Sequence, residues 1–283
     1  MVIIIMLGKL YVVGTPIGNL EDFSPRAVRI LSEVDFIAAE DTRVTLKLLN
    51  HFDIKKELIS YYEHNKSQKG DVIIERLLGG ENCAVVSDAG MPAISDPGED
   101  LVKAAHENGI TVESVPSATA FATALSISGM STGRFCFEGF LSVNKVSRKE
   151  HLNEIKNEKR TLVFYEAPHK LLNTLKDMYE ALGERNIAIV KEITKVHETV
   201  MRTTFSEGIE YFELNQPRGE YVIIIEGKTE TETDGYTLDT AVGLAKDLIK
   251  SGICASAAAK EAANVSGFKK GDIYKMLFDA PKN

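Results

Sequence analysis

The segment 83–98, with the sequence CAVVSDAGMPAISDPG, constrains the fold of this chain more than any other. Its first four residues are apolar without alternation, which predicts a strand covered on both faces, as in a parallel sheet. The small and turn-forming residues Ser87–Gly90 follow that strand. Asp96 and Pro97 are then expected as the cap and first residue of a helix. Ligands bind outside the carboxyl ends of strands in open α/β sheets, so this loop is a candidate site, with an ordinary βα loop as the alternative.

Strand-like and helix-like segments alternate through the first 129 residues. The predicted strands are 10–13, 35–39, 58–61, 83–86 and 111–115. A helix of small residues follows Pro116, with Ser117 as its expected cap, and it ends at Gly129. This alternation predicts a mostly parallel sheet with right-handed crossovers, forming a first α/β domain over residues 1–129.

The second half has more consecutive strands and fewer helices between them. The predicted strands are 135–137, 160–165, 187–191, 196–204 and 219–226, with helices at 145–159 and 170–182. This pattern favours a mixed sheet in a second α/β domain, residues 130–228. A polar stretch, 228–235, is interpreted as a linker. Residues 237–283 then form three short helical patterns, which predict a small helical domain of the helix-turn-helix kind.

Composition limits the classes of function and location. The 283-residue chain has a net charge of -8 and a pI near 5.4, which weakens the case for a nucleic-acid partner, although a local basic patch would suffice. Residues 229–283 hold seven lysines and eight acidic residues, so this tail is not a basic clamp. The apolar start, 1–7, is too short to span a membrane and lacks the basic residues of a signal peptide. Three separate cysteines without a C-x-x-C pair favour a reducing compartment, and we expect a cytoplasmic protein.

Several common site motifs are absent from the sequence. There is no G-x-x-x-x-G-K-[ST] phosphate loop, no G-x-G-x-x-G fingerprint and no H-E-x-x-H zinc motif. Cysteine and histidine pairs with metal-ligand spacing are also missing, so we expect no metal. What remains is a set of small-residue loops at strand ends, which suit a ligand that lacks phosphate and needs many backbone contacts. S-adenosylmethionine is such a ligand, although these residues alone do not single it out.

Five segments resemble one known family, in order along the chain. They are VGTPIGNL (13–20), AEDTR (39–43), SDAGMPAISDPG (87–98), FYEAPHK (164–170) and KEITKVHE (191–198). Together they resemble the tetrapyrrole methylase superfamily, in particular its ribosomal RNA small subunit methyltransferase I branch. The resemblance covers roughly residues 9–227, and the tail is similar to that branch's C-terminal helical domain.

The resemblance implies a fold, a cofactor and a substrate. The implied fold has two α/β domains, of the class III S-adenosylmethionine methyltransferase type, with a small C-terminal helical domain. The implied cofactor is S-adenosyl-L-methionine, held folded in the cleft between the α/β domains. The implied activity is 2'-O-methylation of a cytidine ribose in 16S rRNA at the decoding centre. The partners are 16S rRNA or the small ribosomal subunit, and a homodimer is expected.

Transferred residue by residue, the resemblance also implies a set of cofactor contacts. These are Ser87, Asp88, Ala89, Gly90, Ser117, Ala118, Tyr165, Glu166, Glu192, Gly219 and Glu220. Asp88 or a nearby carbonyl would complement the positive charge of the sulfonium group.

A ribose hydroxyl is a weak nucleophile, so a base or a cation that stabilises the developing alkoxide is expected beside it. The candidates are Glu40, Asp41, Arg43 and Lys191, with Glu192, Lys195 and His197 nearby. Each of them has a structural ion pair or a plain surface charge as the alternative. His169 is interpreted as a helix-start residue. Arg43, Lys170 and Lys195 are candidate phosphate contacts, which position RNA without reading its sequence.

Two other functions stay open from the sequence. One is methylation of a tetrapyrrole or another small molecule, and the other is RNA binding by a non-catalytic relative. For the RNA methyltransferase, the acidic total leads us to expect a local positive surface around the cleft.

Overall fold

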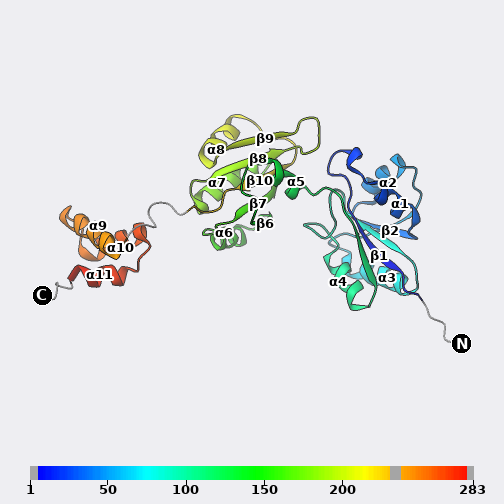
Figure 1. Ribbon diagram of the computed structural model, residues 1–283, viewed down its shortest axis with the longest axis horizontal. Coiled ribbons are helices and arrows are strands. Elements are labelled where there is room, and N and C mark those ends of the chain that lie inside the picture. Colours follow the sequence, from blue (N-terminus) through cyan, green and yellow to red (C-terminus); the bar gives the residue numbers. More distant parts are fainter. Residues whose placement is uncertain (1–5, 230–236, 279–283) are drawn as a thin grey trace. The chain divides into compact units, whose positions relative to one another are not determined.

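The computed structural model describes residues 6–229 and 237–278. The chain divides into two compact units, Met1–Gly227 and Lys228–Asn283. Most of the apolar start, and most of the predicted linker 228–235, lie outside the described residues. The larger unit contains two five-stranded sheets (Figure 1).

The first sheet is entirely parallel, in the order β3-β2-β4-β1-β5. Its strands are β1 (Lys9–Val13), β2 (Phe36–Ala39), β3 (Glu57–Ser60), β4 (Cys83–Val86) and β5 (Thr111–Val115). All four residues of the central strand β4 are buried, because strands flank it and helices cover both faces. The prediction of a parallel sheet around the 83–86 strand is confirmed. This sheet and the helices that cover it are the first lobe.

Four helices cover the first sheet in two layers (Figure 1). On one face, α1 (Pro25–Glu33) and α2 (Thr42–His51) share a core with Val13, Ile37 and Val86. On the other, α3 (Lys66–Leu78) and α4 (Glu99–Glu107) pack on the alternate strand residues. As predicted, Ser24 caps α1 through a 3.1 Å bond from the Ala27 N–H, with Pro25 in the first turn. A short 3-10 turn, Leu20–Asp22, precedes α1.

Two predicted helix caps are wrong. Helix α4 begins at Glu99, with Gly98 as N-cap at φ 141°, and Asp96 does not cap it. The loop before α4 folds back on itself through a 3.3 Å bond from the Ala93 N–H to the Pro97 carbonyl, and this carries Asp96 away from the helix start. The helix of small residues, α5 (Ala120–Ile127), has Thr119 at its N-cap. Ser117 donates instead to the Thr15 carbonyl, at 3.2 Å.

The second sheet is mixed, in the order β6-β7-β10-β8-β9, as predicted. Its strands are β6 (Phe135–Phe140), β7 (Thr161–Glu166), β8 (Asn186–Lys191), β9 (Thr199–Thr204) and β10 (Tyr221–Ile225). Strands β6 and β7 are parallel, whereas β10 is antiparallel to both β7 and β8. Along β10, Tyr221, Ile223 and Ile225 enter one core while Val222 and Ile224 enter the other, so the apolar run is buried on both faces.

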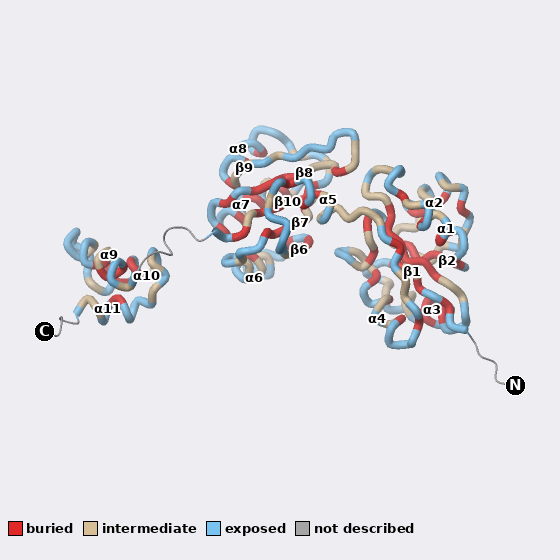
Figure 2. Tube along the Cα trace, viewed as in Figure 1, coloured by how far each residue is buried: buried red, intermediate tan, exposed pale blue. Residues whose placement is uncertain are grey.

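Helices cover both faces of the second sheet as well. The helices α6 (Lys145–Glu154), α7 (Leu171–Leu182) and α8 (Phe205–Leu214) lie on one face, and α5 lies on the other. Sequence analysis did not predict α8. The predicted domain boundary follows Gly129, whereas α5 before it packs on β7 and β10 of the second sheet. The second sheet with α5–α8 is the second lobe, and Figure 2 shows buried strands at the centre of both lobes. The predicted domain limits themselves stay predictions.

The smaller unit contains three helices among its described residues, α9 (Leu238–Lys250), α10 (Ala255–Ser266) and α11 (Lys270–Phe278). They match the three helical patterns predicted there. The unit has a core of its own, formed by Ala241, Ala245, Ala259, Ala262 and Ile273. Small side chains let these short helices pack closely. Within residues 6–229 and 237–278, every helix is too short or too polar to cross a membrane.

Candidate active site

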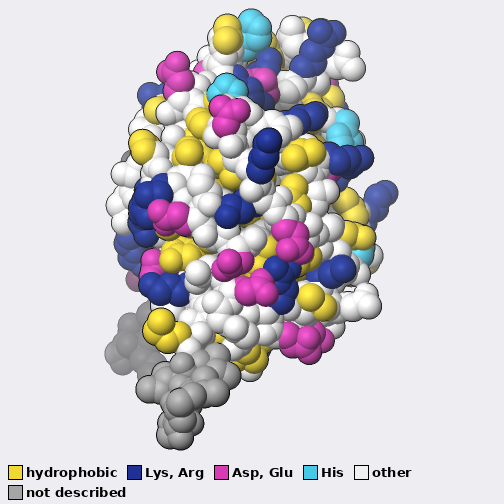
Figure 3. Space-filling model, turned by 90° about the vertical axis from the view of Figure 1, so that its right-hand side faces the viewer, with side chains coloured by type: hydrophobic (Ala, Val, Ile, Leu, Met, Phe, Trp, Pro, Cys, Tyr) yellow, Lys and Arg dark blue, Asp and Glu magenta, His cyan; other side chains and the backbone are white. Residues whose placement is uncertain are grey.

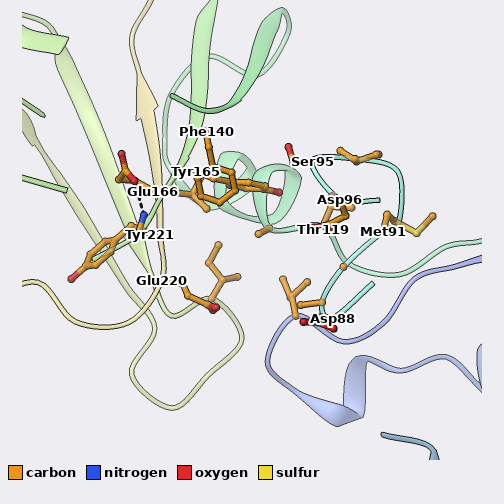
Figure 4. Close-up of a pocket in the computed structure, with 18 of the residues that line it drawn as sticks. Asp88, Met91, Ser95, Asp96, Thr119, Phe140, Tyr165, Glu166, Glu220 and Tyr221 are labelled. Carbon is orange, nitrogen blue, oxygen red and sulfur yellow. Dashed lines mark hydrogen bonds between the residues drawn. The ribbon is translucent and has the colours of Figure 1, made fainter. Parts of the chain in front are cut away.

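A cavity of about 540 Å³ lies within the larger unit, lined by residues of both lobes. We call it the pocket. Its volume is in the range of small-molecule and cofactor sites. The first lobe supplies the ends of β2 and β4 and the loop 88–96. The start of α5, which belongs to the second lobe, also lines the pocket. The second lobe supplies the ends of β6 and β7 and the start of β10. Figure 4 shows Asp88, Ser95 and Asp96 on one side, facing Glu220 and Tyr221 on the other.

Close backbone contacts fix the loops that form the first-lobe wall. Thr15 and Gly90 exchange two backbone hydrogen bonds, of 2.8 and 3.1 Å, which tie the loop after β1 to the loop after β4. A Cβ at Gly14 would lie 2.6 Å from both the Ser117 Cβ and the Met91 sulfur, so a side chain there would force the loops apart. Gly90 has φ +84°, which favours glycine.

Strained backbone is concentrated around the pocket. Five described non-glycine residues have positive φ, and four of them belong to two segments at the pocket: Ala93, Ser95, Glu192 and Thr194. The segments carrying them include the pocket-lining residues Ile94, Asp96 and Ile193. Such conformations are unfavourable for residues with a side chain, persist where the surroundings enforce them, and cluster at functional sites. This strain supports the pocket as the functional site.

Three carboxylates, of Glu40, Asp88 and Asp96, line the first-lobe wall. The Asp88 N–H donates to Glu40 Oε2 at 3.3 Å, and Asp88 Oδ1 accepts the Asp41 N–H at 3.1 Å, so the ends of β2 and β4 are joined. Burial, together with the charges of Asp88 and Asp41, raises the pKa of Glu40. Burial and the charges of Glu40 and Asp88 raise the pKa of Asp96 to about 7. Because partial burial and neighbouring like charges disfavour ionisation, Glu40 and Asp96 release their protons at higher pH than ordinary carboxyl groups.

The second-lobe wall is formed by the end of β7 and the start of β10. The side chain of Glu166 is buried, with one oxygen accepting the Ala167 N–H at 2.8 Å and the other bonded to the Thr174 hydroxyl. The Tyr165 hydroxyl accepts the Phe121 N–H at 3.1 Å, which holds the start of α5 against this wall. Burial raises the pKa of the Tyr165 phenol. These partners orient Tyr165 and Glu166 as fixed walls of the pocket.

The structure brings many of the predicted cofactor residues to the pocket. Those that line it are Asp88, Ala89, Gly90, Tyr165, Glu166 and Glu220. The predicted residues outside its lining are Ser87, Ser117, Ala118, Glu192 and Gly219. Glu192 supports the wall from behind, because its Oε1 accepts the Glu220 N–H at 3.0 Å and contacts Lys195 Nζ at 3.1 Å.

The predicted catalytic candidates lie in different surroundings. Among Glu40, Asp41, Arg43 and Lys191, only Glu40 lines the pocket. Asp41 caps α2 and pairs with Arg43 at 2.6 Å, and bonding to Arg43 lowers the pKa of Asp41. The Arg43 side chain is 85% exposed. Lys191 is half-buried at the end of β8, opposite Tyr221.

The other predicted lysines and histidines also differ in their surroundings, and Lys195 is already in ion pairs. Lys195 bridges Glu220 at 2.9 Å and Glu192 at 3.1 Å, and both bonds raise its pKa, so a phosphate there would compete with two carboxylates. His197 is exposed, and Lys170 is the N-cap of α7. His169 lines the pocket just before α7, in agreement with its interpretation as a helix-start residue.

The prediction of a positive surface is wrong for the walls of the pocket. Among the described residues, five carboxylates line it and no lysine or arginine does: Glu40, Asp88, Asp96, Glu166 and Glu220. On the first-lobe face in Figure 3, Lys and Arg side chains are interspersed with Asp and Glu. The physical reason is that the pocket is built largely from strand ends, where the side chains of Glu40, Asp88 and Glu166 accept backbone N–H groups. Within the described part of the chain, no group of three His, Cys, Asp or Glu is arranged for a metal ion.

Sequence reasoning missed several lining residues, above all Asp96 and Phe140. Asp96 was interpreted as a helix cap, and its sequence signal was the SDPG motif within the 87–98 segment. Phe140 ends β6 with its side chain 57% exposed, and its ring lies 5.4 Å from that of Tyr165. No local pattern marks Phe140, because only the pairing of β6 with β7 brings it to the pocket.

Comparison with known proteins identifies the family. A model of the tetrapyrrole (corrin/porphyrin) methylases matches residues 9–208, which is more than half of the chain. The chain belongs to the tetrapyrrole methylase family. It is therefore an S-adenosylmethionine-dependent methyltransferase, and the predicted resemblance is confirmed.

Two curated relatives and one solved structure show the extent of the similarity. This methylase is 47% identical over 272 residues to the ribosomal RNA small subunit methyltransferase I of Halalkalibacterium halodurans, covering 95% of this chain and 94% of the relative. It is 46% identical to the protein of the same name from Thermotoga maritima, over 78% of this chain and 100% of the relative. About a fifth of this methylase therefore has no counterpart in that relative. The crystal structure of diphthine synthase has the same fold, with a TM-score of 0.60 at 12% identity over 79% of this chain and 91% of that one.

The pocket of this methylase suits the cofactor of its family. S-adenosylmethionine carries a sulfonium and an ammonium group against one carboxylate, so its net charge is positive. Five carboxylates with no lysine or arginine among the described lining residues match that charge. The glycine and alanine of the 88–90 segment leave room for backbone contacts to a flat base or a methionine moiety.

Proposed function

We propose that this methylase transfers a methyl group from S-adenosylmethionine to the 2'-hydroxyl of a cytidine ribose in 16S rRNA, at the decoding centre. The observation that carries the proposal is the 47% identity, over 95% of the chain, to a ribosomal RNA small subunit methyltransferase I. The substrate is then 16S rRNA, free or in the small ribosomal subunit. A cytoplasmic homodimer is part of the same proposal.

The proposed cofactor contacts are those transferred from the family motifs. Asp88, Ala89 and Gly90 at the end of β4 would meet the cofactor from the first lobe, and Tyr165 and Glu166 from the second. The supporting contacts are Ser87, Ser117, Ala118, Glu192, Gly219 and Glu220. When bound, the cofactor supplies an electrophilic methyl group on sulfur. The chain would align the acceptor hydroxyl with that methyl group, and positioning of this kind supplies about 7–11 kcal/mol of barrier reduction.

Asp96 is proposed as the group that takes the proton of the ribose hydroxyl, with Glu40 as the second candidate. Both side chains line the pocket from the first lobe. A base is most effective when its pKa lies near the working pH, and the pKa of Asp96 is about 7. Arg43 is proposed as a phosphate contact, because its guanidinium is exposed. Lys191 stays a candidate for the cation that stabilises the developing alkoxide, and Asp41 stays a further candidate for accepting the proton.

The test uses unmethylated 16S rRNA and small subunits from a strain that lacks this protein. After incubation with the protein and methyl-labelled cofactor, the label should appear as 2'-O-methylcytidine. Methylation of the 2'-oxygen blocks its attack on the adjacent phosphate, so the labelled linkage should resist alkaline hydrolysis. Label on a base would contradict the proposal, as would labelling of a porphyrinogen but no RNA. Cofactor binding without any transfer would favour a non-catalytic RNA-binding protein.

A further inference from the structure

A second cavity, of about 360 Å³, lies between α6 and α7 on the second lobe. Four of its lining residues are basic and two are acidic: Lys145, Arg148, Lys149, Lys156, Asp177 and Glu180. We call this cavity the basic groove. None of its lining residues lines the pocket.

The charges of the basic groove divide into a structural pair and a set of exposed lysines. The Arg148 side chain is only 12% exposed and contacts Asp177 Oδ2 at 2.6 Å and Thr174 Oγ1 at 2.8 Å. This pair fastens α6 to α7 and neutralises Asp177. Lys145, Lys149 and Lys156 are exposed and have no ion pair within 4.0 Å among the described residues. Because Arg148 and Asp177 neutralise each other, the three lysines outweigh the single charge of Glu180, and the groove has a net positive charge.

The basic groove is close to the pocket along the chain. Phe140 lines the pocket, and Lys145 follows it by five residues, a length that spans at most about 18 Å. The two cavities also share a supporting contact. The Thr174 hydroxyl bonds to Arg148 in the groove and to Glu166 in the pocket wall. A polymer with its reacting unit in the pocket can therefore reach the groove within a few units.

We propose that the basic groove binds phosphates of the RNA substrate, a few nucleotides from the ribose held in the pocket. This inference rests on the proposed function. Lys145 and Lys149 are one helical turn apart, about 6 Å along α6, which is on the scale of the spacing between neighbouring phosphates. Lysines at such positions fix the register of a strand without reading its sequence.

Two observations favour RNA over an acidic protein as the occupant. The pocket repels phosphates with its five carboxylates, so a nucleic acid that enters it needs cationic contacts elsewhere nearby. The exposed Phe140 lines the pocket five residues before Lys145 of the groove, and exposed aromatic rings stack unpaired bases of RNA. Both features are expected for a single-stranded RNA segment.

The test neutralises the three exposed lysines together, as Lys145→Gln, Lys149→Gln and Lys156→Gln. Binding of unmethylated 16S rRNA should weaken about tenfold or more, and the slope of log K against log salt should fall by about 2. The affinity for S-adenosylmethionine alone should not change, because these lysines lie outside the pocket lining.

A matched control carries Lys55→Gln, Lys69→Gln and Lys103→Gln on the first lobe. These residues line neither cavity, so the same change in net charge should leave RNA binding near that of the wild type. Equal losses in both triple variants would overturn the proposal. If the wild type labels a ribose and the groove variant binds and methylates RNA to the same extent as the wild type, only the groove proposal fails. If the wild type labels no ribose, the proposed function fails.

Photocrosslinking from position 149 identifies the occupant of the groove. The reaction uses whole small ribosomal subunits and a photoreactive residue in place of Lys149. A crosslink to 16S rRNA is the expected result. A crosslink only to a ribosomal protein would assign the groove to a protein partner and overturn the proposal.

Discussion

The pocket and the basic groove lie close together along the chain and carry opposite charge. Carboxylates from strand ends line the pocket, whereas lysines from a helix surface line the groove. In the pocket, Glu40 and Asp96 are half-buried, and Glu40 and Asp88 accept backbone N–H groups, whereas the groove's lysines are exposed. The difference teaches that one chain can recognise a cationic cofactor and an anionic polymer by keeping their binding charges in separate cavities. A net charge of -8 hides this separation.

The largest effect is expected from a substitution in the pocket that leaves the groove unchanged. Asp96→Asn should lower kcat for rRNA methylation by about a hundredfold or more, because a proton acceptor is removed from the reacting hydroxyl. The affinity for RNA should stay unchanged, because the groove is intact. Single-turnover methylation and filter binding measure the two quantities.

Asp100→Asn is the matched control for this variant. Asp100 is an exposed aspartate on α4 that pairs with Lys66 at 2.8 Å and does not line the pocket. Its loss should leave kcat near the wild-type value. Wild-type activity in Asp96→Asn would remove Asp96 from the mechanism and leave Glu40 as the candidate base.

Salt should weaken RNA binding by about an order of magnitude more than it weakens cofactor binding. Raising monovalent salt from about 50 to 200 mM should weaken RNA binding about tenfold or more, because phosphate contacts release counterions. Binding of S-adenosylmethionine should change by less than about twofold, because the buried Glu166 and the half-buried Glu40 and Asp96 are screened less than the groove's exposed lysines. Calorimetry of each ligand at the two salt concentrations measures this contrast. Equal salt dependence for both ligands would contradict the separation of charges.

A smaller effect is expected on the free energy of unfolding, which should depend on pH through the titration of Asp96. Its pKa is about 7 in the folded chain against a usual 3.8, so between about pH 4 and 7 the folded chain holds a proton that the unfolded chain has released. The free energy of unfolding should therefore decrease as pH rises through this window. Asp96→Asn should flatten that dependence in urea titrations, because its side chain does not titrate.

Cofactor binding should respond to pH in the opposite direction. Affinity for the cationic cofactor should increase as pH rises through about 7 and Asp96 ionises. Calorimetry across this range would detect the change together with proton release. If the cofactor affinity of the wild type did not change with pH, Asp96 would not interact with the cofactor's positive charge.

The smallest effect is expected from removal of residues 228–283. These residues form a separate compact unit, whose three described helices have their own core. The Thermotoga maritima relative is matched over its whole length by 78% of this chain. The shortened chain should fold and bind S-adenosylmethionine within about twofold of the full chain, as for independent sites. Loss of cofactor binding on truncation would show that the pocket depends on the helical unit.

Much of the fold could be predicted from local pattern. The alternating strands and helices specified the parallel first sheet, and the consecutive strands specified the mixed second sheet. Helix α8 was missed, because Phe205–Leu214 directly follows β9 with no turn residue to separate them. The caps at Asp96 and Ser117 were wrong, because the loops holding them bond to other loops that are distant in sequence.

The candidate site was predicted in part. The 87–98 segment, the end of β7 and the start of β10 line the pocket. Loops after parallel strands gather at one edge of a sheet, and antiparallel pairing places the start of β10 beside the end of β7. The raised pKa of Asp96 could not be predicted, because it depends on burial and on the charges of Glu40 and Asp88. The acidic lining was likewise unexpected, since no single segment contains its five carboxylates.

The sequence by itself determined the order of the strands, most of the helices, the β4 loop and the family, because each depends on residues near one another along the chain. Only the tertiary structure decided which carboxylates share the pocket, which cations are already paired, and that three lysines of α6 and its following turn remain exposed. The physical reason is that charge interactions depend on distance and burial. Both are set by the packing of two sheets whose strands come from distant parts of the chain.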